Sequence, residues 1–298
     1  MSNELKSVGL LLGGHGTRDE GGVQQFLELA EGLKRRFKPL PVEAAFLELA
    51  HPNIQTGVER LLERGVGEIV TVPVILFAAG HVKRDIPGQV VAALVARGRS
   101  DVRQVQVEHL GCHPAVVELS RVRMEEAKRG GASGCGVPMR DSGKESGRLA
   151  ACPTEVVGTA HPTCLLLVAR GSSDEGAAAE MREFAALRRA ARPEMPVEVA
   201  FLAKTRPNLD EQLAKLTAAS FERVIVQPHF LFEGELVDRI RGQIMEIAAR
   251  QPQTQWIVTQ PLADSAGKAG LASELLAKVI LDRCGEAGIR VVASPDDD

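Results

Sequence analysis

Two histidines and one glutamate are the residues whose types and spacing best suit chemistry in this chain: His15, Glu48 and His81. Each lies at or just beyond the end of an apolar run that is typical of a buried strand. Two imidazoles and a carboxylate suit a first-row divalent metal with open coordination positions. They also suit proton removal near neutral pH. The three residues therefore predict a metal-binding and proton-accepting site.

The sequence pattern around these residues occurs twice, at an offset of 155 residues. The run from Leu10 to Asp19 returns as Leu165 to Asp174, with apolar and turn positions kept. The three polar residues are not kept, because the second copy has Arg170, Ala203 and Glu235 at the matching positions. Two similar lobes are therefore expected, and only the first retains the metal-binding chemistry.

Alternating strand and helix patterns place these residues at one edge of a parallel sheet. In the first half, strands are predicted at Val8–Leu12, Val42–Leu47, Glu68–Leu76 and Val102–Val107, and helices at Val23–Phe37, from Pro52, at Asp85–Ala96 and at Pro114–Lys128. In the second half, strands are predicted at Cys164–Val168, Val197–Leu202, Arg223–His229 and Trp256–Thr259, with an edge strand at Arg290–Ala293. This order predicts an α/β fold with two similar lobes, each a parallel sheet flanked by helices. His15, Glu48 and His81 then lie at the carboxyl edge of the first sheet, where open sheets bind ligands.

The domain limits follow from a change in composition near the middle of the chain. Residues 130–163 are rich in Gly, Ser and Pro and show little apolar periodicity, as expected of a flexible linker. We therefore expect an N-terminal catalytic lobe at residues 1–129 and a degenerate C-terminal lobe at residues 164–298.

The overall composition argues against several classes of partner. The 298 residues have a net charge of −3 and are 44% hydrophobic. This composition gives no reason to expect nucleic acid or an anionic membrane surface as a binding partner. Neither a signal peptide nor a membrane span is expected. Five cysteines without a CxxC pair are expected to be free thiols in a reducing cytoplasm.

The remaining histidines are expected to be structural. His51 precedes a helix, His161 belongs to the linker, and His229 is expected to pack inside a strand. His109 and His113, with Cys112 between them, are expected to have loop roles, with auxiliary metal binding as the alternative. The small residues beside the histidines are expected to let a large flat ligand approach: Gly13, Gly14, Gly16, Ala78, Ala79 and Gly80.

Three motifs resemble those of the sirohydrochlorin chelatases, the class II cobaltochelatases and ferrochelatases: Leu11–Arg18, Ala45–Leu49 and Val72–His81. The second half, with Gln227–Gly234, looks like the degenerate half of the long form of this family. The resemblance implies two α/β lobes that face each other across a cleft. It also implies that His15 and His81 bind the incoming Co²⁺ or Fe²⁺, which is a substrate, and that Glu48 assists. It implies no organic cofactor. The chain lacks the His-rich tract and the C-terminal cysteine motif of some long members, so no accessory cluster or metal store is expected.

The implied substrate, sirohydrochlorin, carries eight carboxylates and belongs to cobalamin or siroheme biosynthesis. Cationic side chains near the cleft should bind it, since Arg suits bidentate pairing with carboxylates. The candidates are Arg18, Lys83, Arg84, Arg170, Lys204, Arg206 and Arg239. We expect a monomer in which the fused lobes form a pseudo-dimer.

Two other functions remain open from the residues. A non-catalytic carrier of Co, Ni or Fe would use the same His–Glu–His set without acting on a tetrapyrrole. A histidine phosphatase also places His-Gly after its first strand, but it would want Arg where this chain has Gly14. The ligand set does not distinguish cobalt, iron and nickel, because it accepts all three.

Overall fold

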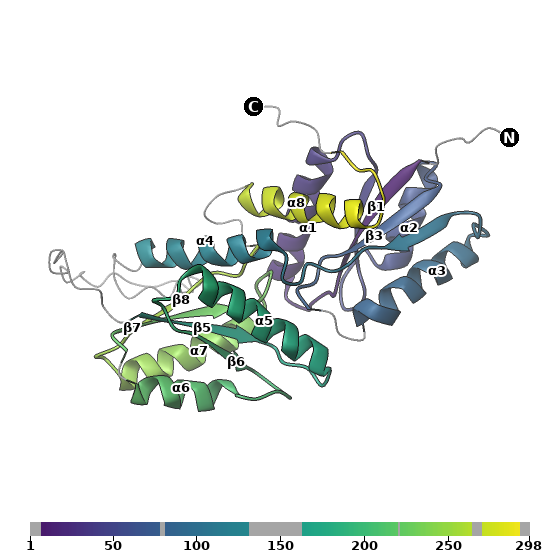
Figure 1. The fold of residues 1–298 in the computed structure, drawn as a ribbon. Helices are drawn as coiled ribbons and strands as arrows, with labels where there is room; N and C mark the ends of the chain where they lie inside the picture. The colour runs from purple at the N-terminus through teal and green to yellow at the C-terminus, as the bar shows by residue number, and fades with distance from the viewer. Residues whose placement is uncertain (1–6, 78–80, 131–162, 220, 264–269, 293–298) are drawn as a thin grey trace, which may run out of the picture.

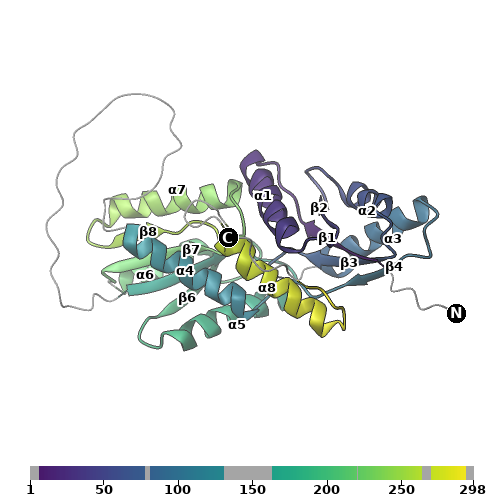
Figure 2. The same ribbon diagram turned by 90° about the horizontal axis from the view of Figure 1, so that it is seen from above.

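The apolar runs of the first half form a parallel sheet with the strand order β2-β1-β3-β4 (Figures 1 and 2). The computed structural model describes residues 7–77, 81–130, 163–219, 221–263 and 270–292. The strands of this sheet are β1 (Val8–Gly14), β2 (Val42–Phe46), β3 (Glu68–Pro73) and β4 (Arg103–Gln106). Between them lie α1 (Glu20–Arg36), α2 (Ile54–Glu63) and α3 (Ile86–Ala96), which is preceded by a π-helix at His81–Asp85. The predicted β-α order and parallel pairing are confirmed.

The second half repeats this sheet with the order β6-β5-β7-β8. Its strands are β5 (Thr163–Ala169), β6 (Val197–Phe201), β7 (Arg223–Pro228) and β8 (Gln255–Val258). Its helices are α5 (Glu175–Ala191), α6 (Leu209–Ala218), α7 (Glu235–Arg250) and α8 (Leu271–Glu286). The duplication expected from the sequence is therefore present in the fold.

Each sheet is buried on both faces, which explains why its central strands are almost wholly apolar. In β1, Leu10 and Leu12 belong to an apolar core that also contains residues of β5, whereas Leu11 belongs to a separate core formed with α2 and α3. In β5, Leu166 faces a third core formed with α6 and α7. Alternate residues of one strand point to opposite faces of the sheet. One face of each sheet therefore packs into the core that the two halves share, and the other face packs into a core of its own half.

Two helices, α4 and α8, each pack against the half of the chain that lies opposite to them in the sequence. Helix α4 (Pro114–Gly130) follows the first sheet in the sequence but packs against β7, β8 and α5 of the second half. Helix α8 ends the second half and packs against α1 of the first half, and α4 and α8 lie side by side (Figures 1 and 2). In the buried contact between α4 and β7, Ser120 Oγ donates to Gln227 Oε1 at 2.5 Å, and Gln227 Nε2 donates to the Ser120 carbonyl at 3.0 Å. Residues 114–130 therefore complete the fold of the opposite half.

Equivalent side chains start equivalent helices in the two halves. Asp19 Oδ1 accepts a hydrogen bond from Gly22 N, and Asp174 Oδ1 accepts one from Gly176 N. The next helix of each half begins after Asn53 or Asn208, whose side chains cap it in the same way. Such caps satisfy backbone N–H groups that have no partner within the helix. Asn53, rather than the predicted Pro52, is therefore the helix-starting residue.

Several predicted boundaries differ from those observed. Strand β3 ends at Pro73, short of the predicted Leu76, and β7 ends at Pro228, short of His229. Among the described residues of the predicted edge strand, 290–292 form no strand. Residues 131–162, which include Cys135, Cys152, His161 and nearly all of the predicted linker, lie outside the described residues. None of the helices in the described part of the chain has the length and apolar character needed to cross a membrane.

Candidate functional site

His15 and Glu48 come together at the carboxyl edge of the first sheet, as the sequence predicts. Because β1 and β2 are paired, the residues that follow them are neighbours. His15 Nε2 lies 3.6 Å from Glu48 Oε1, and the two side chains are 30% and 49% exposed. Two ligands of one tetrahedral metal ion, each at about 2.1 Å from it, are separated by about 3.4 Å. The observed separation therefore suits joint binding of one metal ion.

Backbone contacts fix this pair. Glu48 N donates to His15 O at 3.1 Å, and Leu47 N donates to Gly14 O at 2.9 Å. His15 Nδ1 lies 3.2 Å from Gly16 O. When Nδ1 donates this hydrogen bond, the neutral ring carries its lone pair on Nε2, the nitrogen that faces Glu48. In that tautomer, Nε2 is the ring nitrogen that can bind a metal ion.

Position 16 must be glycine, because the loop that follows β1 lies very close to the loop that follows β2 at this point. Gly16 has a φ of 96°, and a Cβ added to it would overlap the carbonyl oxygen of Glu48. The prediction that the glycines leave room for a flat ligand is wrong for Gly13 and Gly14. Both are buried in the sheet, where an added Cβ would contact Ile86 and Phe26 respectively. Their small size serves core packing, and residues 78–80 lie outside the described residues.

His81 opens the helical segment that follows β3, because the π-helix begins at this residue. Its side chain lies outside the described residues. In the second half, Glu235 opens α7 at the matching place. The backbone thus supports the correspondence between His81 and Glu235. Among the described side chains, no group of three or more His, Cys, Asp or Glu residues gathers around one point.

The matching place in the second half has the same backbone without the same chemistry. Ala203 N donates to Arg170 O at 3.0 Å, and Leu202 N donates to Ala169 O at 3.0 Å. Gly171 has a φ of 82° and lies against the Ala203 carbonyl as Gly16 lies against that of Glu48. The loop pairing was therefore preserved, while the imidazole and carboxylate are replaced by a guanidinium and a methyl group.

All seven predicted substrate-binding cations are exposed: Arg18, Lys83, Arg84, Arg170, Lys204, Arg206 and Arg239. Within the described part of the chain, two of them have carboxylate partners. Lys83 Nζ lies 3.4 Å from Asp174 Oδ2, across the two halves, and Arg206 is paired with Glu211 at 2.7 Å. Asp174 had no signal in the sequence, because the ion pair joins residues that are far apart along the chain.

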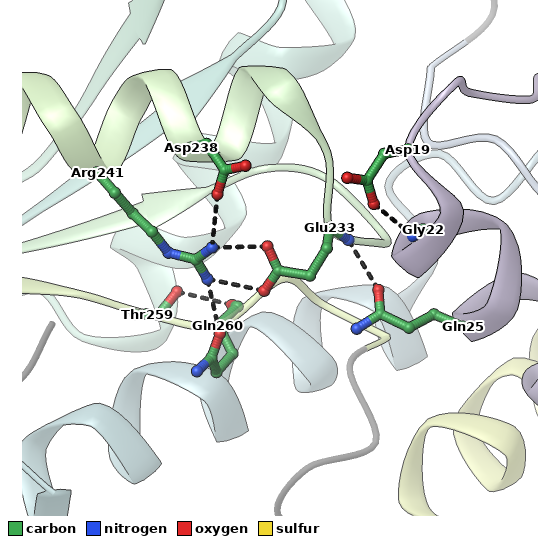
Figure 3. Close-up of polar contacts among 8 residues, drawn as sticks. All are labelled: Asp19, Gly22, Gln25, Glu233, Asp238, Arg241, Thr259 and Gln260. Carbon is green, nitrogen blue, oxygen red and sulfur yellow. Dashed lines mark hydrogen bonds and ion pairs between the residues drawn. The ribbon is translucent and has the colours of Figure 1, made fainter. Parts of the chain in front are cut away.

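A second interaction between the halves lies in the loop that follows β7 (Figure 3). Glu233 N donates to Gln25 Oε1 of α1 at 2.8 Å, and the Glu233 carboxylate forms two hydrogen bonds of 2.7 Å with Arg241. Burial alone lowers the pKa of Arg241, but its bonds to Glu233 raise that pKa above its ordinary value. A Cβ on Gly22 would overlap the Glu233 carbonyl oxygen. The loop is thus held against the first turn of α1, close to its N-cap Asp19 (Figure 3).

Three further histidines, His109, His113 and His229, contact residues of both halves. His109 Nε2 lies 3.0 Å from Glu180 Oε2 of α5, and His113 Nε2 lies 3.1 Å from Asp282 Oδ2 of α8. His229 is 3% exposed and packs between the rings of Phe77 and Phe184, at centroid distances of 4.9 and 4.4 Å. The predicted packing of His229 is confirmed, although it lies just beyond the strand. Burial lowers its pKa to about 3.

The described cysteines are unpaired, as predicted. Cys112, Cys164 and Cys284 are free thiols, and Cys164 lies buried in β5. Burial raises the pKa of Cys164 to about 12, so this thiol stays protonated near neutral pH.

Two lobes, each built on a parallel sheet, define a duplicated α/β protein, and the facing imidazole and carboxylate of His15 and Glu48 at the edge of the first sheet form a site suited to a divalent metal. The CbiX family model matches residues 9–127 and again residues 164–283. The chain therefore belongs to the CbiX family, which confirms the resemblance found in its sequence.

Named relatives and solved structures agree with this assignment. Sirohydrochlorin ferrochelatase from Priestia megaterium is 28% identical over 239 residues, which cover 80% of this chain and 79% of that protein. Sirohydrochlorin cobaltochelatase from Sulfolobus acidocaldarius is 37% identical over 121 residues, covering 40% of this chain and 92% of that protein. SirB from Bacillus subtilis with Fe³⁺ has the same fold, with a TM-score of 0.73 and 24% identity over 95% of this chain and 98% of that chain.

Proposed function

We propose that this chain inserts a divalent metal, Co²⁺ or Fe²⁺, into sirohydrochlorin. Membership of the CbiX family and relatives named as sirohydrochlorin ferrochelatase and cobaltochelatase support this activity. The observation that carries it is the His15–Glu48 pair, 3.6 Å apart in the first half, where the second half has Arg170 and Ala203. A single metal site beside an inert copy suits an enzyme that binds one metal and one macrocycle.

The reaction exchanges one metal ion for two pyrrole N–H protons of the free-base macrocycle. His15 Nε2 and Glu48 first hold the metal through few ligands, so that it can leave them for the four pyrrole nitrogens. We assign His81 to the same site, because it opens the next helix at the same sheet edge. As the metal leaves, the carboxylate of Glu48 and an imidazole are free to accept the two protons and pass them to water.

The exposed cations are proposed to bind the carboxylates of the substrate. Arg170 takes the place of His15 in the second half, where a guanidinium cannot ligate a metal while it is protonated. We therefore assign substrate binding to Arg170, together with the other cations of the two sheet edges: Arg18, Lys83, Arg84, Lys204, Arg206 and Arg239. This division gives metal binding to the first half and substrate binding to both.

We also propose that the enzyme acts as a cytoplasmic monomer without an organic cofactor. The halves already share a core and exchange helices α4 and α8, so one chain supplies both lobes. Size-exclusion chromatography with light scattering tests this proposal, and a stable dimer would overturn the monomeric assignment.

Anaerobic incubation with sirohydrochlorin and either Co²⁺ or Fe²⁺, followed by absorption spectroscopy, tests the activity. We expect the free-base spectrum to convert to that of the metallated product. His15→Ala should abolish most of this conversion while its thermal melt stays close to wild type, because the His15 ring is outside the core. A folded His15→Ala variant with full activity, or a wild-type protein that binds metal without converting the substrate, would reject the proposal. The latter result would instead indicate a metal carrier.

Arg170→Ala separates the roles of the halves. Loss of one charge-assisted hydrogen bond to a substrate carboxylate, worth about 1.5–3 kcal/mol, should raise the KM for sirohydrochlorin. The Kd for Co²⁺ should not change. Unchanged KM would remove Arg170 from the substrate site, and loss of Co²⁺ binding would reverse the assignment of the halves.

A further inference from the structure

Leu49, which directly follows Glu48, combines exposure with an unfavourable backbone conformation. It is 52% exposed, although it is a large apolar residue, and its φ is 65°. Residues other than glycine avoid this left-handed region, because Cβ then approaches the next carbonyl oxygen. Core packing does not account for an exposed side chain. Backbone strain of this kind persists where the surrounding structure enforces it, which is common at ligand-binding sites.

The strained residue is the centre of a tight turn. Ala50 N donates to Glu48 O at 2.9 Å, which closes a three-residue γ-turn over Leu49. The same Glu48 carbonyl lies against Gly16, and Glu48 N donates to His15 O. The turn is therefore fixed by the loop that carries His15. This arrangement holds Leu49 at a constant place beside the His15–Glu48 pair.

The second half has the same strained turn around a different side chain. Lys204 has a φ of 59°, and Thr205 N donates to Ala203 O at 2.7 Å across it. The turn was thus kept although Glu48 is replaced by Ala203. A turn needed only to orient a metal ligand has no function in this half. Its retention indicates a role that both halves share, namely the presentation of the central residue to a common ligand.

We propose that Leu49 is a substrate-positioning residue that contacts the apolar face of the tetrapyrrole macrocycle. This inference rests on the proposed function and extends it. Sirohydrochlorin is a flat conjugated ring with carboxylates on its rim, so it needs apolar contact on its face and cations around its edge. Leu49 supplies the first kind of contact at the metal-binding half. Lys204 supplies the second at the equivalent turn of the other half.

Two substitutions at Leu49 test the contact. Leu49→Ala and Leu49→Gly both remove the apolar side chain, and glycine also relieves the left-handed strain. Both should raise the Kd for free-base sirohydrochlorin, measured by spectral titration without metal, about three- to tenfold, as expected when a half-exposed leucine loses its apolar contact. Leu49→Gly should also resist urea better than Leu49→Ala. The Kd for Co²⁺ should equal that of wild type in both variants.

Val95→Ala is the matched control, because Val95 is an aliphatic residue of α3 that is 61% exposed. It should leave sirohydrochlorin binding unchanged. If both Leu49 variants bind sirohydrochlorin with the wild-type Kd, this inference is overturned, but the proposed chelatase function is not affected. A weakened Co²⁺ affinity would also overturn it, because Leu49 would then act by holding Glu48. If wild-type protein fails to bind sirohydrochlorin at all, the proposed function itself fails, a result distinct from either of these.

Discussion

Lys83 and Asp174 form an ion pair that joins the two halves beside the candidate site. Lys83 Nζ lies 3.4 Å from Asp174 Oδ2, and the side chains are 57% and 32% exposed. Lys83 follows His81 by two residues in the π-helix, and Asp174 caps α5 four residues after Arg170. Contact with Lys83 and two backbone N–H groups lowers the pKa of Asp174, with the hydrogen bond from Gly176 N as the largest cause. Asp174 is therefore ionised at neutral pH and competes for a cation assigned to the substrate.

Asp174→Asn should strengthen binding of sirohydrochlorin. Asparagine caps a helix as well as aspartate does, so α5 should keep its start, while Lys83 loses its carboxylate partner. An exposed ion pair is weak, so the KM should fall by up to about fivefold. Steady-state kinetics at fixed Co²⁺ measures this change.

Glu175→Gln is the control for Asp174→Asn, because it removes one negative charge at the next residue of the same helix. Its KM should change less than that of Asp174→Asn. Equal effects in the two variants would mean that only overall charge matters. An unchanged KM in Asp174→Asn would remove Lys83 from the substrate site.

Glu48→Gln should slow metal insertion more than it weakens substrate binding. The amide keeps the size of the side chain but loses the negative charge and the ability to take up a proton. Removal of a positioned acid–base group typically lowers the rate about 10²- to 10⁴-fold. The kcat and the Kd for free-base sirohydrochlorin, measured on the same preparation, separate the two effects. A normal kcat with a raised Kd would assign Glu48 to substrate binding instead.

The meeting of His15 and Glu48 could be predicted because it depends on local rules. Both residues follow apolar strands, and parallel strands bring their carboxyl ends to one edge. The packing of α4 on the opposite sheet could not be predicted in this way. The apolar face of α4 is compatible with either sheet, and the choice depends on contacts such as Ser120–Gln227, whose residues are far apart in the sequence. The Lys83–Asp174 pair was missed for the same reason.

The γ-turns were missed because no local residue signals them. A left-handed position is usually marked by glycine or asparagine, and here it is occupied by Leu49 and Lys204. The part of this arrangement that can be recognised in the sequence is the pair of glycines, Gly16 and Gly171. Each lies against the carbonyl group that accepts the hydrogen bond of the γ-turn. The offset alignment pairs the two glycines, but it does not show which carbonyl each one meets. That information exists only in the packing of two loops.

His229 should make the stability of the fold dependent on pH. Neither of its ring nitrogens has a hydrogen-bond partner among the described residues, and burial lowers its pKa to about 3. The unfolded imidazole titrates near 6.5. The unfolded state therefore binds a proton that the folded state excludes, so stability is full above pH 6.5 and is lost as the pH falls from 6.5 toward 3.

His229→Val, which introduces the residue found at the matching Val74, should remove this dependence. Between pH 7 and pH 5, wild type should lose about 2 kcal/mol more unfolding free energy than the variant, since the linkage is about 1.4 kcal/mol per pH unit. Urea denaturation at the two pH values measures the difference. All other titrating groups are common to both proteins, so their contributions cancel when the two losses of unfolding free energy are compared. Equal losses in the two proteins would show that the native fold admits a proton at His229.

Alanine at Gly16 and at Gly171 should separate a structural cost from a catalytic one. Both glycines have a positive φ, 96° and 82°, and an added Cβ would overlap the carbonyl of residue 48 or 203. Each variant should therefore lose at least about 1 kcal/mol of stability. In Gly16→Ala the displaced residue is Glu48, so Co²⁺ affinity and insertion rate should both fall. In Gly171→Ala it is Ala203, which carries no ligand, so Co²⁺ affinity should stay at the wild-type value. Co²⁺ titrations on the two folded variants show whether the metal contacts lie in the first half alone. An equal loss of Co²⁺ affinity in both variants would place metal contacts in both halves.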